Sequence, residues 1–166
     1  GAAATRAAET LVVPAANMPT YTDAVSIAVK GKMTYADGDT STNVSFHDWA
    51  VNGSNQIKTT LSTVGSATGQ ILFYQAALGV VDNVNTGPSV YSPSINVPYK
   101  IASRHGSTFI NGATNGTALT ANTTPTAIAD LSATDFVLGK TFMGTISELR
   151  VWPVDITDAG IEEASA

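Results

Sequence analysis

The chain alternates apolar and polar residues with a period of two, and the clearest example is the stretch 25–35, VSIAVKGKMTY. Its apolar residues Val25, Ile27, Val29 and Met33 fall on one face, with small or polar residues on the other. Successive side chains of a β-strand point to opposite faces, so this pattern predicts a long strand with one buried face. Shorter runs of the same kind recur along the chain, separated by residues typical of turns. The pattern predicts an antiparallel all-β sandwich or barrel.

Two dipeptides mark tight turns between such runs. Asn52 and Gly53 separate two alternating stretches, and both residues tolerate a positive φ, which favours a short hairpin. His105 and Gly106 separate two further runs. We therefore expect a second hairpin, with Arg104 and His105 exposed at its tip.

The stretch 142–152, FMGTISELRVW, is expected to form the last strand. Ile146, Leu149 and Val151 cannot all face inward in strict alternation, which predicts a β-bulge or a twist between them. We expect this strand to lie beside the first strand of the domain, within 9–14.

The residues after the last strand predict one short helix. Thr157 or Asp158 is expected to cap its N-terminus, because a side-chain oxygen at this position accepts a hydrogen bond from a free backbone N–H. Ile161 is expected to pack onto the sandwich as an apolar plug.

The composition limits the classes of partner. Of the 166 residues, 43% are hydrophobic and 13% charged, which is ample apolar material for one buried core. The net charge of −5 and the scattered lysines and arginines argue against nucleic acid and anionic membranes. No apolar run is long enough to insert into a membrane, and the absence of cysteine excludes disulfides and thiolate metal sites. Residues 1–8 are interpreted as a linker arm from an upstream domain, and 9–166 as a single domain.

Several segments carry a resemblance to a known family. The order of the long strand, the hairpin arm ending in INGA, the short FVLGK strand and GTISELRVW resembles the concanavalin A-like lectin/glucanase jelly roll, its laminin-G-like branch in particular. Residues 95–113 and 132–152 also resemble the C-terminal lectin-like domain of phage and prophage structural (tail) proteins. The resemblance implies an antiparallel two-sheet jelly-roll sandwich. It leaves the ligand open, because this fold carries sugar binders, glycosidases, lyases and spacer domains.

Catalysis is not expected from these residues. The glucanases of this fold need two carboxylates about 5 Å apart on one strand face. Here Glu148 has Arg150 at the position where a second acid would share its face, and the strand arginines and histidine of the polysaccharide lyases are also missing. A divergent polysaccharide hydrolase or lyase remains an alternative.

No cofactor is expected, and calcium has only weak candidates. Asp37 and Asp39 flank a glycine in a predicted turn and offer two hard oxygen ligands, whereas calcium takes six or more. Asp82, Asn83 and Asn85 form a second weak cluster. A solvated turn is the simpler interpretation of both.

A sugar-binding surface needs an aromatic ring for the pyranose C–H face and polar groups for its hydroxyls. Alternation places His47 and Trp49 on one face of their strand and Phe46 and Asp48 on the other. If Phe46 is in the core, His47 and Trp49 form an exposed platform. The alternative is that Trp49 is in the core and that the alternation changes phase at a bulge, since tryptophan is usually largely buried.

Four further side chains are candidate glycan contacts. Tyr74 is expected to face away from its neighbour Phe73. Arg104 and His105 offer hydrogen bonds at the predicted hairpin tip, and Tyr91, in a proline-rich loop, is expected to line the same edge.

Together with the resemblance, these features lead to one functional hypothesis. The domain is expected to be a non-catalytic, carbohydrate-binding module of a phage virion or tail protein, exposed on the virion surface outside the cell. Its partners would be a host-surface or environmental polysaccharide and the upstream domain. The alternative from a different class is a structural or decoration domain without a ligand.

Overall fold

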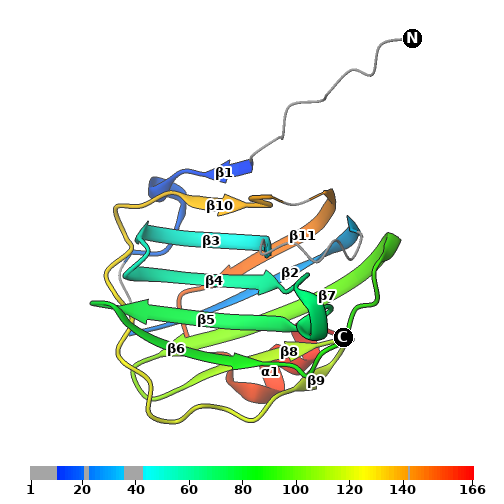
Figure 1. The fold of residues 1–166 in the computed structure, drawn as a ribbon. Coiled ribbons are helices and arrows are strands. Elements are labelled where there is room, and N and C mark those ends of the chain that lie inside the picture. The colour runs from blue at the N-terminus through cyan, green and yellow to red at the C-terminus, as the bar shows by residue number, and fades with distance from the viewer. Residues whose placement is uncertain (1–10, 21–22, 36–42, 142) are drawn as a thin grey trace.

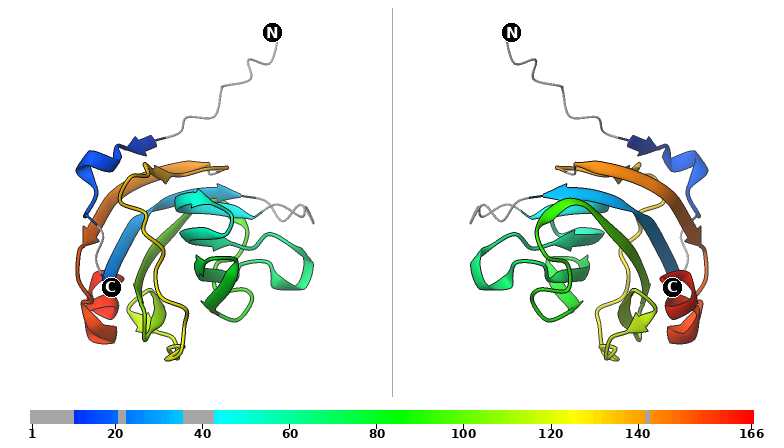
Figure 2. Two further views of the ribbon diagram at one scale, coloured as in Figure 1. Left: turned by 90° about the vertical axis from the view of Figure 1, so that its left-hand side faces the viewer. Right: turned by 90° about the vertical axis from the view of Figure 1, so that its right-hand side faces the viewer.

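The computed structural model describes residues 11–20, 23–35, 43–141 and 143–166. The predicted linker arm, 1–8, and the calcium candidates Asp37 and Asp39 lie outside these residues. Within the described residues, eleven strands form two antiparallel sheets that pack face to face. Figure 1 shows the six-stranded sheet in front of the five-stranded one, and Figure 2 shows both from the side as curved layers. The predicted antiparallel two-sheet sandwich is confirmed.

The six-stranded sheet runs in the order β1 (Leu11–Val13), β10 (Phe136–Leu138), β3 (Val44–Asn52), β4 (Asn55–Leu61), β5 (Ile71–Ala77) and β6 (Val80–Asn85). The five-stranded sheet runs in the order β11 (Gly144–Trp152), β2 (Ala24–Tyr35), β7 (Ser94–Gly106), β8 (Ile110–Thr114) and β9 (Thr117–Ala118). Two short 3₁₀ turns, η1 (Ala15–Asn17) and η2 (Gly65–Ala67), and the helix α1 (Thr157–Ala164) complete the described elements. This helix has eight residues, and the described part of the chain has no helix of the length and apolarity that a membrane span requires.

The core lies between the sheets and is built from the inward residues of each strand. Phe46 of the six-stranded sheet contacts Tyr99 of the five-stranded sheet, with ring centroids 4.8 Å apart. Phe73 is fully buried and lies over the backbone of Gly112, where a Cβ atom would sit 2.0 Å from its ring. Gly112 is therefore required where this ring meets β8, and burial of these apolar surfaces is the main source of stability.

The outer face of the five-stranded sheet is covered by α1. Ala28, Ala102 and Ala113 lie in register on three adjacent strands and form a flat seat for the helix. Ile161 of α1 packs into this seat and is fully buried, as the sequence predicted. The helix therefore covers the five-stranded sheet and does not lie on the outer face of the six-stranded sheet.

A long irregular connection, residues 119–135, leads from β9 to β10 and is called the crossing segment below. Figure 2 shows it spanning the side of the sandwich between the two sheets. Asn122 bridges to Ile110 of β8, and Gln75 donates from Nε2 to the Thr126 carbonyl. Trp49 donates from Nε1 to the Thr134 carbonyl at 3.0 Å. These contacts fix the segment against both sheets.

Two local predictions are confirmed. The strand β11 has a bulge between Ile146 and Glu148, where its register to β2 shifts. The hairpin at Asn52 also forms, with Asn52 paired to Asn55.

Two other local predictions are wrong. The last strand pairs with β2 and not with the first strand, because β1 pairs with β10 in the opposite sheet. Neither Thr157 nor Asp158 caps α1 with its side chain; the carboxylate of Asp155 accepts the Thr157 N–H at 2.8 Å instead.

Candidate ligand-binding surfaces

The predicted platform of His47 and Trp49 is in the core. The two side chains share one face of β3, as alternation predicted, but this face points inward and they are only 1% and 5% exposed. His47 stacks on Phe136 with ring centroids 5.2 Å apart. The cause is a bulge between Ser45 and His47, which inserts Phe46 as an extra residue and lets both Phe46 and His47 face inward. The prediction of an exposed platform is wrong.

Tyr91 and His105 are also buried. The Tyr91 hydroxyl lies 3.2 Å from the Asn115 amide oxygen, and its ring is 4% exposed. Burial raises the pKa of Tyr91 above its ordinary value, although contacts with Lys100 and Asn115 oppose this shift. His105 is fully buried because it alternates with Ile101 and Ser103 on the inward face of β7, which continues through Gly106, so the predicted exposed hairpin tip is wrong.

Arg104 is held in an ion-pair network and is not free for a ligand. On the outer face of β7, its Nη1 donates to Asp158 at 2.6 Å and its Nη2 to Asp155 at 3.0 Å. The guanidinium also lies 4.1 Å from the centroid of the Phe109 ring. Partial burial acts to raise the pKa of Asp158, but hydrogen bonds from Asn111 and Arg104 and the charge of Arg104 outweigh it and lower the pKa. The network anchors the end of the chain to the sheet.

Tyr74 is the candidate that remains on the surface. As predicted, it faces away from the buried Phe73, onto the outer face of the six-stranded sheet, where it is half-buried. The Lys58 ammonium lies 4.4 Å from the centroid of its ring. The aromatic ring is thus presented on the face that carries no helix in the described residues.

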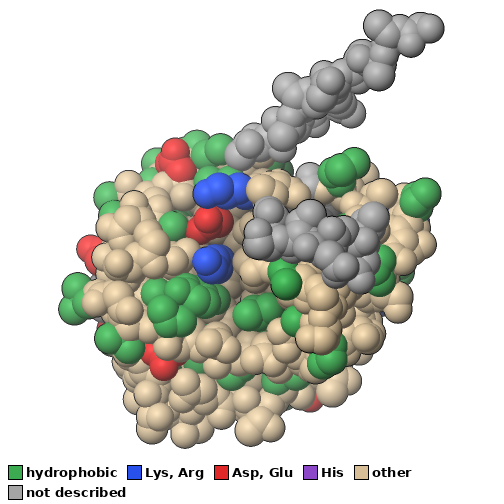
Figure 3. All heavy atoms as spheres, in the orientation of Figure 1, with side chains coloured by type: hydrophobic (Ala, Val, Ile, Leu, Met, Phe, Trp, Pro, Cys, Tyr) green, Lys and Arg blue, Asp and Glu red, His purple; other side chains and the backbone are tan. Residues whose placement is uncertain are grey.

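Tyr74 belongs to a line of side chains that crosses this face, which we call the sheet-face row. Strand register aligns Asp48, Lys58, Tyr74 and Asn83 on four adjacent strands. At one end, the Lys140 ammonium lies 3.6 Å from the Asp48 carboxylate. Figure 3 views this face and shows basic and acidic side chains close together on it. The row combines an aromatic ring with a carboxylate, two ammonium groups and an amide.

The carboxylate of Asp48 has an unused acceptor. Its Oδ1 accepts no hydrogen bond from the described residues and is shielded by its surroundings, while Oδ2 faces Lys140. Buried polar atoms are nearly always hydrogen-bonded, so this oxygen at the end of the row is an exception among the described residues.

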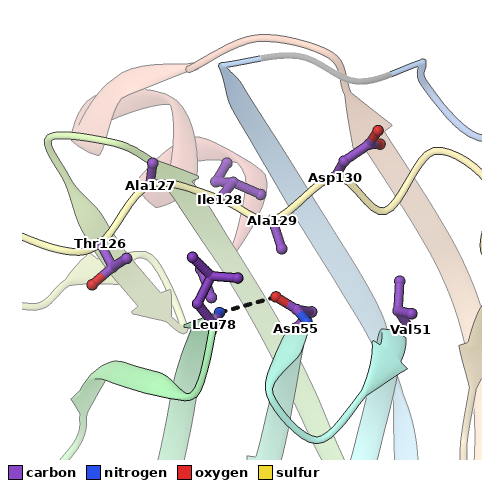
Figure 4. A pocket seen from close by; sticks show the side chains of 9 residues that line it. Val51, Asn55, Leu78, Thr126, Ala127, Ile128, Ala129 and Asp130 are labelled. Atoms are coloured by element: carbon purple, nitrogen blue, oxygen red, sulfur yellow. Dashed lines mark hydrogen bonds between the residues drawn. The ribbon is translucent and has the colours of Figure 1, made fainter.

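A second surface feature is a pocket of about 470 Å³, the hairpin-tip pocket, at one end of the six-stranded sheet. It lies between the tips of the β3–β4 and β5–β6 hairpins and residues 126–130 of the crossing segment. Figure 4 shows Val51 and Leu78 pointing toward this segment, with the Ala129 methyl between them. Asn55 is fixed on the rim because its Oδ1 accepts the Leu78 N–H at 3.0 Å. The lining is mostly apolar, with polar groups at the rim.

His47 and His105 belong to a group of polar side chains that are buried inside the core. Their Nδ1 atoms, the Thr59 hydroxyl and the Gln75 Oε1 have no hydrogen-bond partner among the described residues, while His105 Nε2 lies 3.1 Å from the Ser103 hydroxyl. Burial lowers the pKa of His47 to about 3. Burial, with a smaller contribution from His47, lowers the pKa of His105 to about 3 as well. Both imidazoles are neutral at physiological pH.

The described residues contain no cluster of three or more potential metal ligands of the His, Cys, Asp and Glu types. Asp82, one of the weak calcium candidates, uses its carboxylate to hold the crossing segment, accepting from the Thr126 N–H at 2.8 Å. The carboxylate of Glu148 pairs with Arg150 at 2.8 Å. These contacts give both acidic groups structural partners.

Sequence reasoning missed Asp48, Lys58 and Leu78. Alternation correctly places Asp48 on the face opposite His47, but with Phe46 in the core strict alternation turns that face inward, whereas the bulge turns it outward. Lys58 and Tyr74 lie in two alternating stretches that form the adjacent strands β4 and β5, and they are directly paired in the register of these strands. That register is the signal that links the two residues.

Comparison with known proteins identifies the fold but no sequence family. No protein-family model matches the chain, and no characterised protein sequence matches it significantly. Many solved structures, by contrast, match the fold of this chain. One is the CBM40 of the Ruminococcus gnavus IT-sialidase bound to α2,6-sialyllactose, with a TM-score of 0.63 and 11% identity over 87% of this chain and 84% of that chain.

Two other matching structures come from proteins of different kinds. The heptameric SAP-like pentraxin from Limulus polyphemus has a TM-score of 0.59 and 9% identity, over 87% of this chain and 70% of that chain. The botulinum neurotoxin serotype D binding domain has a TM-score of 0.69 and 10% identity, over 97% of this chain but only 40% of that chain. At such low identities the similarity establishes the fold alone, an antiparallel two-sheet jelly-roll sandwich, as predicted.

Proposed function

We propose that this domain is a non-catalytic carbohydrate-binding module that holds a polysaccharide across the outer face of its six-stranded sheet. The observation that carries the proposal is the sheet-face row, in which the half-buried ring of Tyr74 lies among Asp48, Lys58 and Asn83. A pyranose ring would stack on Tyr74, and the flanking carboxylate, ammonium and amide would bind its hydroxyls.

Lys58 would change position when a sugar binds. Its ammonium lies over the Tyr74 ring, and a cation–π contact at an exposed site contributes only about 0.5–1 kcal/mol. A sugar ring can therefore displace it at low cost, after which the ammonium is free to donate to a sugar oxygen. The carboxylate of Asp48, whose side chain is 16% exposed, supplies the matching acceptor.

Structures with this fold support the choice of ligand class. The CBM40 named above is bound to sialyllactose, and cell entry of botulinum neurotoxin type C, whose structure has a TM-score of 0.64 to this chain, depends on two ganglioside molecules. These ligands belong to those proteins; they favour a glycan here without naming it. The ion-paired Glu148 supports a binding role over hydrolysis.

Glycan arrays and calorimetry on host-surface and environmental polysaccharides test the proposal. We expect Tyr74→Ala to weaken binding at least tenfold, about 1.4 kcal/mol, because the stacking surface is lost. The matched control is Ile95→Ala, an exposed apolar side chain on β7 of the other sheet. Failure of the folded domain to bind any polysaccharide, or unchanged affinity in Tyr74→Ala, would favour a ligand-free structural domain. Release of reducing ends or unsaturated products would favour a hydrolase or lyase.

We further propose that the module is carried on the surface of a phage virion, joined to an upstream domain of a tail protein, and that it recognises the host. The support is the resemblance of 95–113 and 132–152 to the terminal domains of such proteins. Mass spectrometry of purified virions tests the location. Competition of host adsorption by the purified domain, with Tyr74→Ala as the inactive control, tests the role; absence of the chain from virions would refute the proposal.

A further inference from the structure

Leu78 has a backbone conformation that leucine rarely adopts. It is the first residue of the two-residue turn between β5 and β6, with φ 52°, and Gly79 follows with φ 83°. Turns with two positive φ values are normally built from Asn, Asp or Gly, because a left-handed conformation brings Cβ too close to the following carbonyl. The leucine is therefore unfavourable at this position for local reasons.

The interior of the protein does not compensate for this conformation. The Leu78 side chain is 89% exposed, so it buries little apolar surface. The backbone of the turn is fixed independently, since the Leu78 N–H is bound by Asn55 Oδ1 and the Gly79 N–H by the Ser54 carbonyl at 3.1 Å. Asparagine would fit the same backbone without the strain. Strained residues of this kind are concentrated at ligand-binding sites.

The exposed side chain forms one wall of the hairpin-tip pocket. Val51, 55% exposed, and Ala129 supply the other apolar surfaces, and Figure 4 shows these groups around a common space. Its volume of about 470 Å³ lies in the range of small-ligand sites. Asn55 Nδ2, whose contact with Asn52 is long at 3.5 Å, is the rim donor for a ligand carbonyl.

Charge limits the ligand further. Asp130 is the charged side chain among the lining residues, and hydrogen bonds from the Ser132 hydroxyl and N–H lower its pKa, so it is ionised at neutral pH. A negative group at the margin disfavours anionic sugars. The pocket suits a neutral ligand with a methyl group and a carbonyl.

We propose that the hairpin-tip pocket binds a neutral acetamido sugar, with its acetyl methyl against Leu78 and Ala129 and its carbonyl on Asn55. The inference rests on the proposed function, in which the same glycan continues onto the sheet-face row. Leu78 lies four residues along β5 from Tyr74, roughly 13 Å at the rise of a strand, so one oligosaccharide can reach both.

The test is an NMR titration of the ¹⁵N-labelled domain with methyl N-acetyl-β-glucosaminide. We expect the backbone amides of Leu78, Gly79 and 127–130 to shift. Methyl β-glucoside, which lacks the acetamido group, and N-acetylneuraminic acid, which is anionic, should leave these amides unchanged at the same concentration. Equal shifts with the glucoside, or no shift in the pocket, would overturn the proposal.

Leu78→Asn separates binding from folding. We expect its Tm to rise by about 2–4 °C as the strain is removed, while the affinity for the acetamido sugar falls at least fivefold. Val80→Ala, on the same hairpin and also exposed, is the matched control and should bind as the wild type does. A lower Tm, or unchanged affinity, in Leu78→Asn would refute the role of Leu78.

The residues whose amide signals shift distinguish the pocket proposal from the proposal that the sheet-face row binds a glycan. Shifts confined to the amides of Lys58, Tyr74 and Asn83 would refute the pocket while supporting glycan binding on the sheet face. Shifts confined to the pocket are the expected result with this monosaccharide, which is too short to span the roughly 13 Å between Leu78 and Tyr74.

Discussion

The guanidinium of Arg104 lies along the carboxylate of Asp155, with Nε 2.9 Å from Oδ1 and Nη2 donating to Oδ2 at 3.0 Å. The two residues are 51 positions apart, and the pair ties the segment before α1 to the outer face of β7. Nη2 makes the hydrogen bond of this ion pair, and a charge-assisted hydrogen bond is stronger than one between neutral groups. Arg104 therefore acts as a structural clamp, where the sequence suggested a glycan contact.

Arg104→Ala is expected to destabilise the domain by about 2 kcal/mol. The loss leaves Asp155 and Asp158 without their cation, but both are partly solvated, so it should be smaller than for a fully buried pair. Urea denaturation checks the value. Arg150→Ala, which removes an arginine 60% exposed, is the control and should cost less than about 0.5 kcal/mol. Equal losses in both variants would contradict the clamp.

Mild acid is expected to destabilise the domain through His47 and His105. Burial lowers both pKa values to about 3, whereas the unfolded chain takes up protons near the ordinary value of 6.5. The unfolded state therefore binds more protons between these values, so stability is full above pH 6.5 and falls as the pH decreases toward 3. The limiting slope is about 1.4 kcal/mol per pH unit for each histidine.

Denaturation curves at pH 7, 6 and 5 measure this slope. His47→Phe, which keeps the stacking on Phe136, should roughly halve it. The slope between pH 6 and 5 is the diagnostic one, because carboxylates titrate at lower pH. A stability that is constant over this interval would show that the imidazoles are not held neutral by burial.

Gly112→Ala is expected to cost about 3 kcal/mol or more. The added methyl would sit 2.0 Å from a ring carbon of Phe73, and a packed core relaxes only partly around such an overlap. The double variant Gly112→Ala with Phe73→Leu should be more stable than the sum of the single changes predicts, because the smaller side chain makes room. Strict additivity of the two losses would contradict the contact.

Trp49→Phe is expected to loosen the crossing segment and leave glycan affinity unchanged. The change removes the hydrogen bond to the Thr134 carbonyl and should cost about 1–2 kcal/mol. Limited proteolysis should cut residues 119–135 faster than in the wild type. Ile95→Ala is the control and should be cut at the wild-type rate. A loss of glycan affinity without faster cleavage would restore Trp49 as a ligand contact.

Calcium is not expected to contribute to stability or binding. In sequence, the turn with Asp37 and Asp39 offers two hard oxygen ligands, whereas calcium takes six or more, and the Asp82 carboxylate is used to hold the crossing segment. Thermal unfolding with calcium and with a chelator should give the same Tm. A calcium-dependent rise in Tm that Asp37→Ala or Asp39→Ala removes would contradict this prediction.

Several features were predictable because they depend on neighbouring residues alone. The alternation in 25–35 predicted β2, and the uneven spacing of Ile146, Leu149 and Val151 predicted the bulge that the register of β11 contains. Tyr74 was correctly placed opposite Phe73, because no bulge interrupts β5 in its pairing with either neighbour.

The candidate site was less predictable, and β3 shows why. A single extra residue, Phe46, changes the phase of the strand, so that His47 and Trp49 point into the core and Asp48 points out. Nothing local to the run NVSFHDWAV specifies this bulge; it depends on how β3 pairs with β4 and on which side the other sheet lies.

The sequence by itself determined an all-β chain, most strand positions and the apolar plug at Ile161, because pleat geometry and turn chemistry act over a few residues. The tertiary structure decided which faces became core and which became surface. It buried four of the six predicted contacts, paired Arg104 with acids about fifty positions away, and aligned Asp48, Lys58 and Tyr74 on three strands. Those outcomes depend on strand register and on the packing of one sheet against the other, which are non-local properties of the chain.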